Sequence, residues 1–208
     1  MNAPAPLLAG SLGARLLPAP PPLPLKPTRS DYDLNPTARA LAPPNLVPAA
    51  VLIPIVARPE PTVLFTQRTE HLPRHPGQIS FPGGRVHGDD GSLVDTALRE
   101  MKEETGIGAE FVSVEGFLDV YETGTGYIIL PVVGLLREGF ALAPDASEVA
   151  HVFEVPLAFL LDPESRQEHR LEWKGGMRLV YAFQWETHYI WGATASMLVN
   201  LAERLSAP

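Results

Sequence analysis

Residues 92–106 read SLVDTALREMKEETG, and this segment decides how the middle of the chain folds. It opens with a capping box, in which the Ser92 hydroxyl accepts a hydrogen bond from the backbone N–H of Asp95 and the Asp95 side chain reaches back to that of Ser92. Gly106 suits a helix end because glycine adopts positive φ freely. The segment therefore predicts a helix over about 93–105. Its apolar residues recur at spacings of three and four and form one buried stripe, made of Val94, Ala97, Leu98 and Met101.

Three glutamates form a second stripe beside the apolar one, because Glu100, Glu103 and Glu104 also recur at spacings of three and four. Like charges this close repel one another. A divalent cation would relieve the repulsion, since carboxylate oxygens are the hard ligands that Mg²⁺ and Mn²⁺ prefer. A solvated acidic face with Arg99 paired to Glu103 is the simpler interpretation, and the helix alone favours it.

The loop before this helix favours the metal-binding interpretation over the solvated acidic face. Phe81-Pro82-Gly83-Gly84 follows a predicted strand, and paired glycines let backbone amides approach an anion where a side chain would collide. A glycine loop by itself also fits any tight turn. The glycine loop, the capped helix and the run REMKEETGI at 99–107 are together far more specific than any one of them alone.

The run at 99–107 resembles the second half of the Nudix box and matches every fixed position of that pattern. The first half departs from it. One extra residue lies between Gly84 and Arg99, and Gly91 stands where the box has its first glutamate, with two aspartates immediately before it. In this family that glutamate mostly braces the loop. The resemblance implies a Nudix-type fold, an α/β/α sandwich with a mixed β-sheet.

A second signature points to one branch of the family. Leu64–Thr69 and Gly77–Gly84 resemble the extra motif of the coenzyme A pyrophosphatases, which also tend to carry the one-residue loop extension. Here Phe65 replaces a leucine, and Pro73 replaces an arginine with Arg74 next to it. The resemblance covers roughly 51–205 and includes shorter matches at 123–127, 131–133, 148–157 and 190–195.

The resemblance implies roles for particular residues. Glu100 and Glu103 would belong to the catalytic group, and Arg99 would orient a glutamate. The general base would be Glu103 or Glu148, although Glu148 fits equally well as an acid at the start of a helix. The implied metal ligands are Glu100, Glu103, Glu104 and the backbone carbonyl of Gly84. The candidate substrate-binding residues are Arg68, Arg74, His75, Gly83 and Thr123.

Three functions compete at this stage. The favoured one is Mg²⁺-dependent hydrolysis of the diphosphate linkage of coenzyme A, giving 4′-phosphopantetheine and adenosine 3′,5′-bisphosphate, with Mn²⁺ able to replace Mg²⁺. The second is a Nudix hydrolase for another nucleoside diphosphate derivative, such as ADP-ribose, a dinucleotide or a nucleoside triphosphate. The third is a binding module that keeps the fold without catalysis, and the intact glutamates speak against it.

Composition narrows the choice of partners. The 208 residues carry a formal net charge of −8, include no cysteine and are 45% hydrophobic. Absence of cysteine excludes disulfides and thiolate metal sites. The acidic balance disfavours a nonspecific nucleic-acid binder, and no apolar run is long enough to span a membrane. We therefore expect a cytoplasmic protein with a small-molecule nucleotide substrate. A homodimer is compatible with the sequence.

Proline and strand patterns divide the chain. Prolines crowd residues 1–45, which predicts an extended arm, packed or loosely ordered, that is dispensable for chemistry. Residues 46–208 would form the Nudix hydrolase domain. Strands and helices mix without strict βαβ alternation, which predicts an α+β or layered α/β fold. Strands are expected at 49–56, 62–67, 111–121 and 127–136, a partly helical segment broken by Pro156 at 148–161, a hairpin about Gly175-Gly176 and a final helix at 193–205.

Overall fold

The computed structural model describes residues 12–173 and 176–206 of the chain. Its main sheet is mixed and runs in the order β1-β7-β8-β2-β3-β4, with β5 paired to β2, β6 to β8 and β9 to β3. The predicted α+β, layered architecture with a mixed sheet is confirmed. The strands of this sheet are β1 (Arg29–Ser30), β2 (Val47–Val56), β3 (Thr62–Arg68), β4 (Ile79–Ser80), β5 (Gly83–Arg85), β6 (Val112–Phe117), β7 (Tyr121–Glu122), β8 (Tyr127–Leu136) and β9 (Val149–Pro156).

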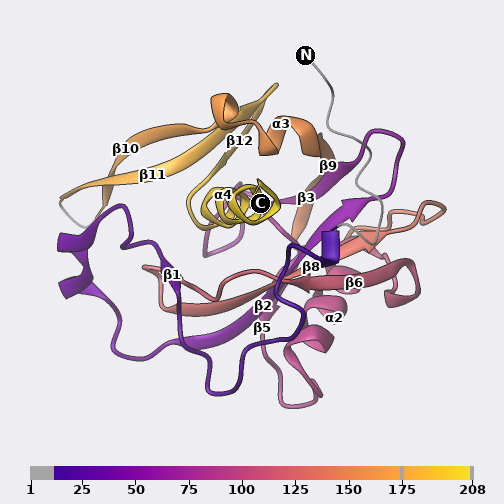
Figure 1. The fold of residues 1–208 in the computed structure, drawn as a ribbon, viewed down its shortest axis with the longest axis horizontal. Helices are drawn as coiled ribbons and strands as arrows, with labels where there is room; N and C mark the ends of the chain where they lie inside the picture. Colours follow the sequence, from indigo (N-terminus) through magenta and orange to yellow (C-terminus); the bar gives the residue numbers. More distant parts are fainter. Residues whose placement is uncertain (1–11, 174–175, 207–208) are drawn as a thin grey trace.

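Helices lie on both sides of this sheet (Figure 1), and a hydrophobic core lies on each of its two faces. Helix α2 (Leu93–Thr105) packs on one face through Ala97 and Met101. Helix α4 (Ala193–Ser206) packs on the other through Leu198 and Leu201. The short elements that connect the layers are α3 (Leu157–Leu161), η1 (Pro36–Leu41), η2 (Ala109–Phe111) and η3 (Pro163–Ser165).

A small antiparallel sheet of three strands covers the α4 side. Its strands are β10 (Gln167–Trp173), β11 (Gly176–Trp185) and β12 (His188–Trp191). The predicted hairpin is present as β10 paired with β11, from Gln167↔Ala182 to Trp173↔Gly176. The expected turn residue Gly175 lies outside the described residues.

The segment 148–161 differs from its sequence-based prediction. Its first half is not helical but forms strand β9, which pairs antiparallel with β3 from Thr62↔Pro156 to Arg68↔Val149. The backbone hydrogen bonds and side-chain packing that β9 gains by pairing with β3 outweigh the weak helical pattern of this segment. Only Leu157–Leu161, after Pro156, is helical. The predicted strand at 111–121 is likewise divided into β6 and β7.

The described part of the proline-rich arm packs on the domain. Leu12 and Leu16 are buried in the core on the α4 side, and Tyr32 is buried as well. Strand β1 pairs parallel with β7, through Arg29↔Tyr121 and Ser30↔Glu122. The arm therefore contributes core side chains and a sheet strand, although the division of the chain at residue 46 stays a prediction.

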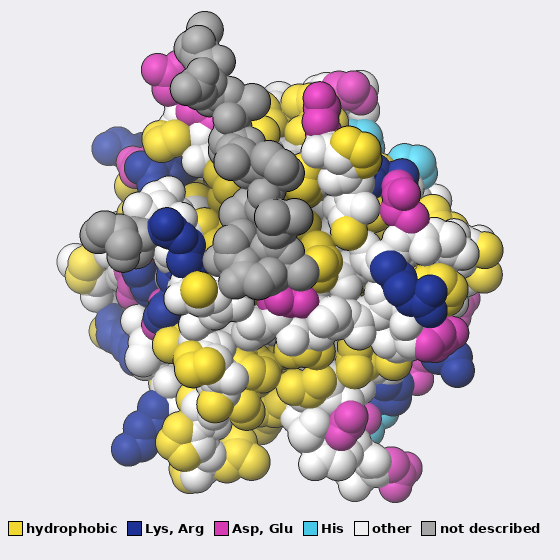
Figure 2. All heavy atoms as spheres, turned by 45° about the vertical axis from the view of Figure 1, so that its right-hand side comes forward, with side chains coloured by type: hydrophobic (Ala, Val, Ile, Leu, Met, Phe, Trp, Pro, Cys, Tyr) yellow, Lys and Arg dark blue, Asp and Glu magenta, His cyan; other side chains and the backbone are white. Residues whose placement is uncertain are grey.

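Within the described residues, no helix combines the length and the apolar character needed to cross a membrane. Figure 2 shows basic side chains interspersed with acidic ones on the face it presents. The described part of that face offers no broad basic surface of the kind that nonspecific nucleic-acid binding uses.

Candidate active site

Helix α2 begins and ends as its sequence predicts. The Ser92 hydroxyl accepts a hydrogen bond from the Asp95 backbone N–H at 3.1 Å. Gly106 adopts φ 80°, and its N–H donates to the Lys102 carbonyl at 2.9 Å. Two residues of the predicted apolar stripe, Val94 and Leu98, are only half-buried. The helix is therefore fixed at both ends, and the glutamates in its last two turns have defined positions.

Arg99 holds two of the three glutamates. Its Nη1 donates to Glu100 at 2.8 Å and to Glu103 at 2.9 Å, while its Nη2 donates to the backbone carbonyl of Arg85 at 3.1 Å. One guanidinium thus ties the end of strand β5 to the acidic stripe of α2. This arrangement is the one expected of a residue that orients glutamates.

Asp90 braces the loop between β5 and α2. It accepts from Arg99 Nε at 2.9 Å, from the His87 backbone N–H at 2.8 Å and from the Thr96 hydroxyl at 2.8 Å. The hydrogen bonds from Arg99 and His87 hold the pKa of the Asp90 carboxyl well below its usual range. Asp90 thereby supplies the bracing that Gly91 lacks, a role that its position beside Gly91 signalled but that the sequence alone did not assign.

Replacing Asp90 by alanine is expected to weaken activity at limiting Mg²⁺ by about 10–100-fold, because residues that orient metal ligands commonly contribute that much. The measurement is the Mg²⁺ dependence of turnover. Asp89→Ala is the matched control, since Asp89 is the exposed neighbour. Equal Mg²⁺ dependence in the two variants would contradict the bracing role.

Glu104 lies in a different environment from Glu103. Its side chain is buried, with 5% of the residue exposed, and accepts a hydrogen bond from the Thr66 hydroxyl on β3 at 3.0 Å. Burial raises the pKa of Glu104 to about 8. Glu103 is exposed instead. The simpler interpretation, a solvated acidic face, therefore does not hold for Glu104, because β9 and β3 extend over that side of the helix.

The paired glycines allow β5 to lie directly against its neighbours. Gly84 pairs with Ala50 of β2, and a Cβ at this position would collide with the Glu100 carboxylate. A Cβ on Gly83 would lie 2.6 Å from the Ala50 carbonyl oxygen. The structure thus brings the Gly84 backbone and the Glu100 side chain together, as a shared metal site would require.

The oxygen donors at this place suit a hard divalent cation. Burial raises the pKa of Glu100, and Glu104 makes none of the ion pairs found in the described residues. Two desolvated carboxyls side by side are unfavourable unless a cation joins them. No three acidic or histidine side chains of residues 12–173 and 176–206 converge on a common point, because Arg99 draws Glu100 and Glu103 toward itself. The types of donor atom therefore fit a divalent cation, while Glu100 and Glu103 in this structure are turned toward the Arg99 guanidinium.

Glu148 is exposed and directly precedes strand β9. Its backbone carbonyl accepts from the Thr69 N–H at 2.9 Å, and its charge helps to raise the pKa of Glu104, although burial is the larger cause. The alternative reading of Glu148 as an acid at a helix start is wrong, since a strand follows it. The structure thus brings Glu148 near the glutamates of α2.

Arg68, Arg74 and His75 also come together. Burial lowers the pKa of His75, and the charges of Arg68 and Arg74 lower it further. The Arg68 Nε is buried and has no hydrogen-bond partner among residues 12–173 and 176–206. Arg68 is close enough to Glu104 for its charge to lower the pKa of that carboxyl, against the larger effect of burial. Arg68 therefore lies beside the acidic group rather than apart from it.

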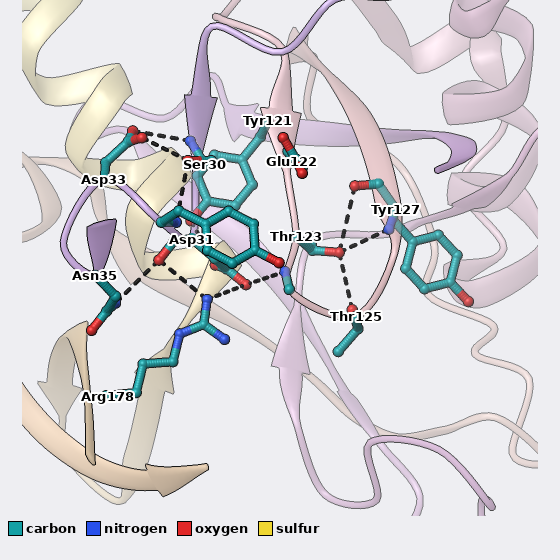
Figure 3. Close-up of polar contacts among 12 residues, drawn as sticks. Ser30, Asp31, Asp33, Asn35, Tyr121, Glu122, Thr123, Thr125, Tyr127 and Arg178 are labelled. Carbon is teal, nitrogen blue, oxygen red and sulfur yellow. Dashed lines mark hydrogen bonds and ion pairs between the residues drawn. The ribbon is translucent and has the colours of Figure 1, made fainter. Parts of the chain in front are cut away.

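Thr123 supports a turn instead of facing solvent. It is buried, and its hydroxyl accepts from the Tyr127 N–H at 3.0 Å and shares a hydrogen bond with Thr125 at 3.0 Å (Figure 3). Gly124 in the same turn donates its N–H to Asp31 of the arm at 2.6 Å. Thr123 is thus placed to shape the loop between β7 and β8.

Asp31 joins three distant parts of the chain (Figure 3). Besides Gly124, it accepts from the Tyr121 hydroxyl at 2.7 Å and pairs with Arg178 of β11 at 3.0 Å. Asn35 adds hydrogen bonds to the backbone of Asp31 and Leu179. Sequence reasoning missed Asp31 and Arg178, because residues 147 positions apart give no local signal of their contact.

Comparisons with known proteins agree with this geometry. Residues 46–174 match the sequence profile of the NUDIX domain. Proteins called "Uncharacterized Nudix hydrolase NudL" from Yersinia pestis (strain Pestoides F) and Yersinia pseudotuberculosis serotype O:3 (strain YPIII) are 42% identical over 158 residues, which is 76% of this chain and 79% of theirs.

Solved structures give weaker similarity. A Caenorhabditis elegans Ap4A hydrolase in a binary complex is 20% identical at a TM-score of 0.46, covering 52% of this chain and 80% of that one. The Nudix domain of Shewanella oneidensis NrtR, complexed with ADP ribose, is 21% identical at a TM-score of 0.42, covering 61% and 86%. Similarity at this level says nothing about the substrate of the present protein.

Proposed function

The chain belongs to the Nudix family and is a hydrolase of that family, and from this premise we propose that its substrate is coenzyme A or a derivative of it. Hydrolysis of the diphosphate linkage would give 4′-phosphopantetheine and adenosine 3′,5′-bisphosphate. Nudix hydrolases generally use divalent metal ions. Mg²⁺ is the ion proposed here, with Mn²⁺ as a substitute, because carboxylate oxygens suit both.

The observation that carries this proposal is the position of the cations. Arg68, Arg74 and His75 belong to the segment that resembles the coenzyme A branch. Both arginines lie near His75, and Arg68 also lies near the buried Glu104. Coenzyme A carries a ribose 3′-phosphate in addition to its diphosphate. A site for it therefore needs cationic side chains next to the hydrolytic carboxylates, and Arg68 and Arg74 supply them.

The protein's own residues have distinct tasks in this reaction. Glu100, Glu103, Glu104 and the Gly84 carbonyl would hold the metal, which neutralises charge on the phosphate oxygens and lowers the pKa of a bound water when present. Arg99 orients Glu100 and Glu103 through its two hydrogen bonds. Water attacks one phosphorus, its bond to the bridging oxygen breaks, and the proton of the water passes to Glu103 or Glu148.

A second candidate substrate is another nucleoside diphosphate derivative. ADP-ribose, a dinucleotide and a nucleoside triphosphate are the members of this class that the sequence leaves open. The three glutamates and Arg99 serve such substrates equally well, because this part of the site acts on the diphosphate alone. The choice between the two candidates therefore depends on the cations around the 3′-phosphate.

We expect kcat/KM to be roughly tenfold or more higher for coenzyme A than for its 3′-dephospho form, because a charge-assisted hydrogen bond contributes about 1.5–3 kcal/mol. The difference should shrink in Arg68→Ala or Arg74→Ala. The assay compares both substrates with ADP-ribose and NADH in Mg²⁺. Equal rates on coenzyme A and its dephospho form in the unmutated enzyme would refute the 3′-phosphate site and leave the family assignment intact.

A further inference from the structure

Three arginines near the candidate site have no carboxylate partner within the part of the chain that the structure describes. The chain has 24 acidic and 16 basic residues, so acids to pair with are plentiful. Nevertheless Arg68, Arg74 and Arg85 take part in none of the ion pairs within the described residues. Guanidinium groups left unpaired next to a proposed phosphate site are the side chains to which an anion would bind most strongly.

Arg85 directs its charge at a neutral group. Its Nη2 and Nε donate to the Tyr127 hydroxyl at 2.8 and 3.3 Å, and its guanidinium carbon lies 5.4 Å from the centre of the Tyr127 ring. A phenol hydroxyl orients the guanidinium without neutralising it. Arg85 is exposed, so its remaining N–H groups are open to a ligand from solvent.

Arg74 lies near the same tyrosine and comes from another loop. Burial would raise the pKa of Tyr127, but the hydrogen bonds from Arg85 and the charges of Arg85 and Arg74 lower it from its usual value. Two like charges beside one neutral side chain repel each other. An anion held between Arg74 and Arg85 would remove this repulsion and accept hydrogen bonds from both.

The backbones of Tyr127 and Arg85 are each held by hydrogen bonds to neighbouring segments. The Tyr127 backbone is held by Thr123, whose turn is anchored to Asp31, and Figure 3 shows the Tyr127 ring pointing away from that anchor. Arg85 directly follows Gly84 in β5, and its carbonyl accepts from Arg99. Arg85 and Tyr127 therefore have defined positions next to the helix that carries the glutamates.

We propose that Arg74, Arg85 and Tyr127 form the subsite for the phosphate group of the substrate that is not cleaved, which is the ribose 3′-phosphate if the substrate is coenzyme A. This inference rests on the proposed function and adds Arg85 and Tyr127 as residues that determine specificity. Arg85 and Tyr127 bind in this scheme and take no part in the bond cleavage, so their loss affects KM more than kcat.

Binding without turnover tests the subsite directly. Titration calorimetry in EDTA compares adenosine 3′,5′-bisphosphate with adenosine 5′-monophosphate. The unmutated protein should bind the bisphosphate at least about tenfold more tightly, and Arg85→Gln should abolish most of that preference. Tyr127→Phe should reduce it by about fivefold, because one hydrogen-bonding hydroxyl is lost.

Arg166→Gln is the matched control, since Arg166 also lies 5.4 Å from the centre of a tyrosine ring, that of Tyr181. It should leave the bisphosphate preference unchanged, and thermal melting establishes that every variant is folded. An unchanged preference in folded Arg85→Gln overturns the subsite. Turnover of coenzyme A by the unmutated enzyme is scored separately. Its absence would refute the proposed substrate, whereas loss of bisphosphate preference in Arg85→Gln would still support the anion subsite.

Discussion

Replacing Glu103 or Glu104 by glutamine is expected to lower turnover by at least about a hundredfold at saturating Mg²⁺. Each change removes a carboxylate charge while keeping nearly the same side-chain volume. Glu103 is exposed beside Arg99, and Glu104 is buried beside Thr66, so neither contributes to the apolar contacts of α2. The measurement is steady-state hydrolysis of coenzyme A or of whichever diphosphate the enzyme accepts.

Glu110→Gln is the control, because Glu110 is an exposed acid of η2 outside the site. It should retain the rate of the unmutated enzyme. If Glu103→Gln and Glu104→Gln both kept near-normal rates, the assignment of these residues as metal ligands would be wrong.

Glu104→Gln should also raise the melting temperature of the metal-free protein. The folded-state pKa of Glu104 is raised from 4.5 to about 8. The stability that the protonated carboxyl gives is full below pH 4.5 and is lost as the pH rises toward about 8. The difference in melting temperature between variant and unmutated protein, measured in EDTA, should therefore be smallest at low pH and grow over this interval. A lower melting temperature at every pH would show that Glu104 stabilises the fold.

Deleting residues 1–44 is expected to abolish folding, contrary to the prediction from composition that the arm is dispensable. Burial of each of Leu12, Leu16 and Tyr32 contributes about 1.5–3 kcal/mol. Loss of Asp31 removes its ion pair with Arg178, and breaking a largely buried ion pair costs up to about 3–5 kcal/mol. Together these losses are comparable with the whole stability of a typical domain, about 5–15 kcal/mol. The deletion variant should be insoluble or lack a cooperative thermal transition.

The single substitution Asp31→Ala tests the ion pair between Asp31 and Arg178 by itself. Its melting temperature should fall by roughly 6–20 °C, because each kcal/mol lost corresponds to about 2–4 °C in a chain of this size. Asp33→Ala is the control. Asp33 is exposed, and within the described residues its carboxylate accepts hydrogen bonds only from Ser30 in the same loop, so its loss should shift the transition much less. A deletion variant that melts like the full chain would show that the arm is dispensable after all.

Local patterns were sufficient wherever the physical cause is local. The capping box at Ser92 and the positive φ of Gly106 depend on a few neighbouring residues, so the bounds of α2 followed from its sequence. Strand β8 matches its predicted range for the same reason, since a continuous apolar run with a glycine turn before it forms a buried strand. Assignment to the Nudix family depended on the same short run of residues and the loop before it.

Contacts between distant segments were decided only by the tertiary structure. The exposure of Glu103 and the burial of Glu104 differ because β3 and β9 cover only one side of α2, which helical spacing does not reveal. The segment 149–156 became a strand because β3 offered an edge to pair with. Asp90 took the bracing role, Asp31 met Arg178, and Arg85 met Tyr127, each through hydrogen bonds that side-chain geometry creates after the chain has folded. The sequence thus predicted which residues would carry the chemistry, whereas packing determined which of them are buried, paired or exposed.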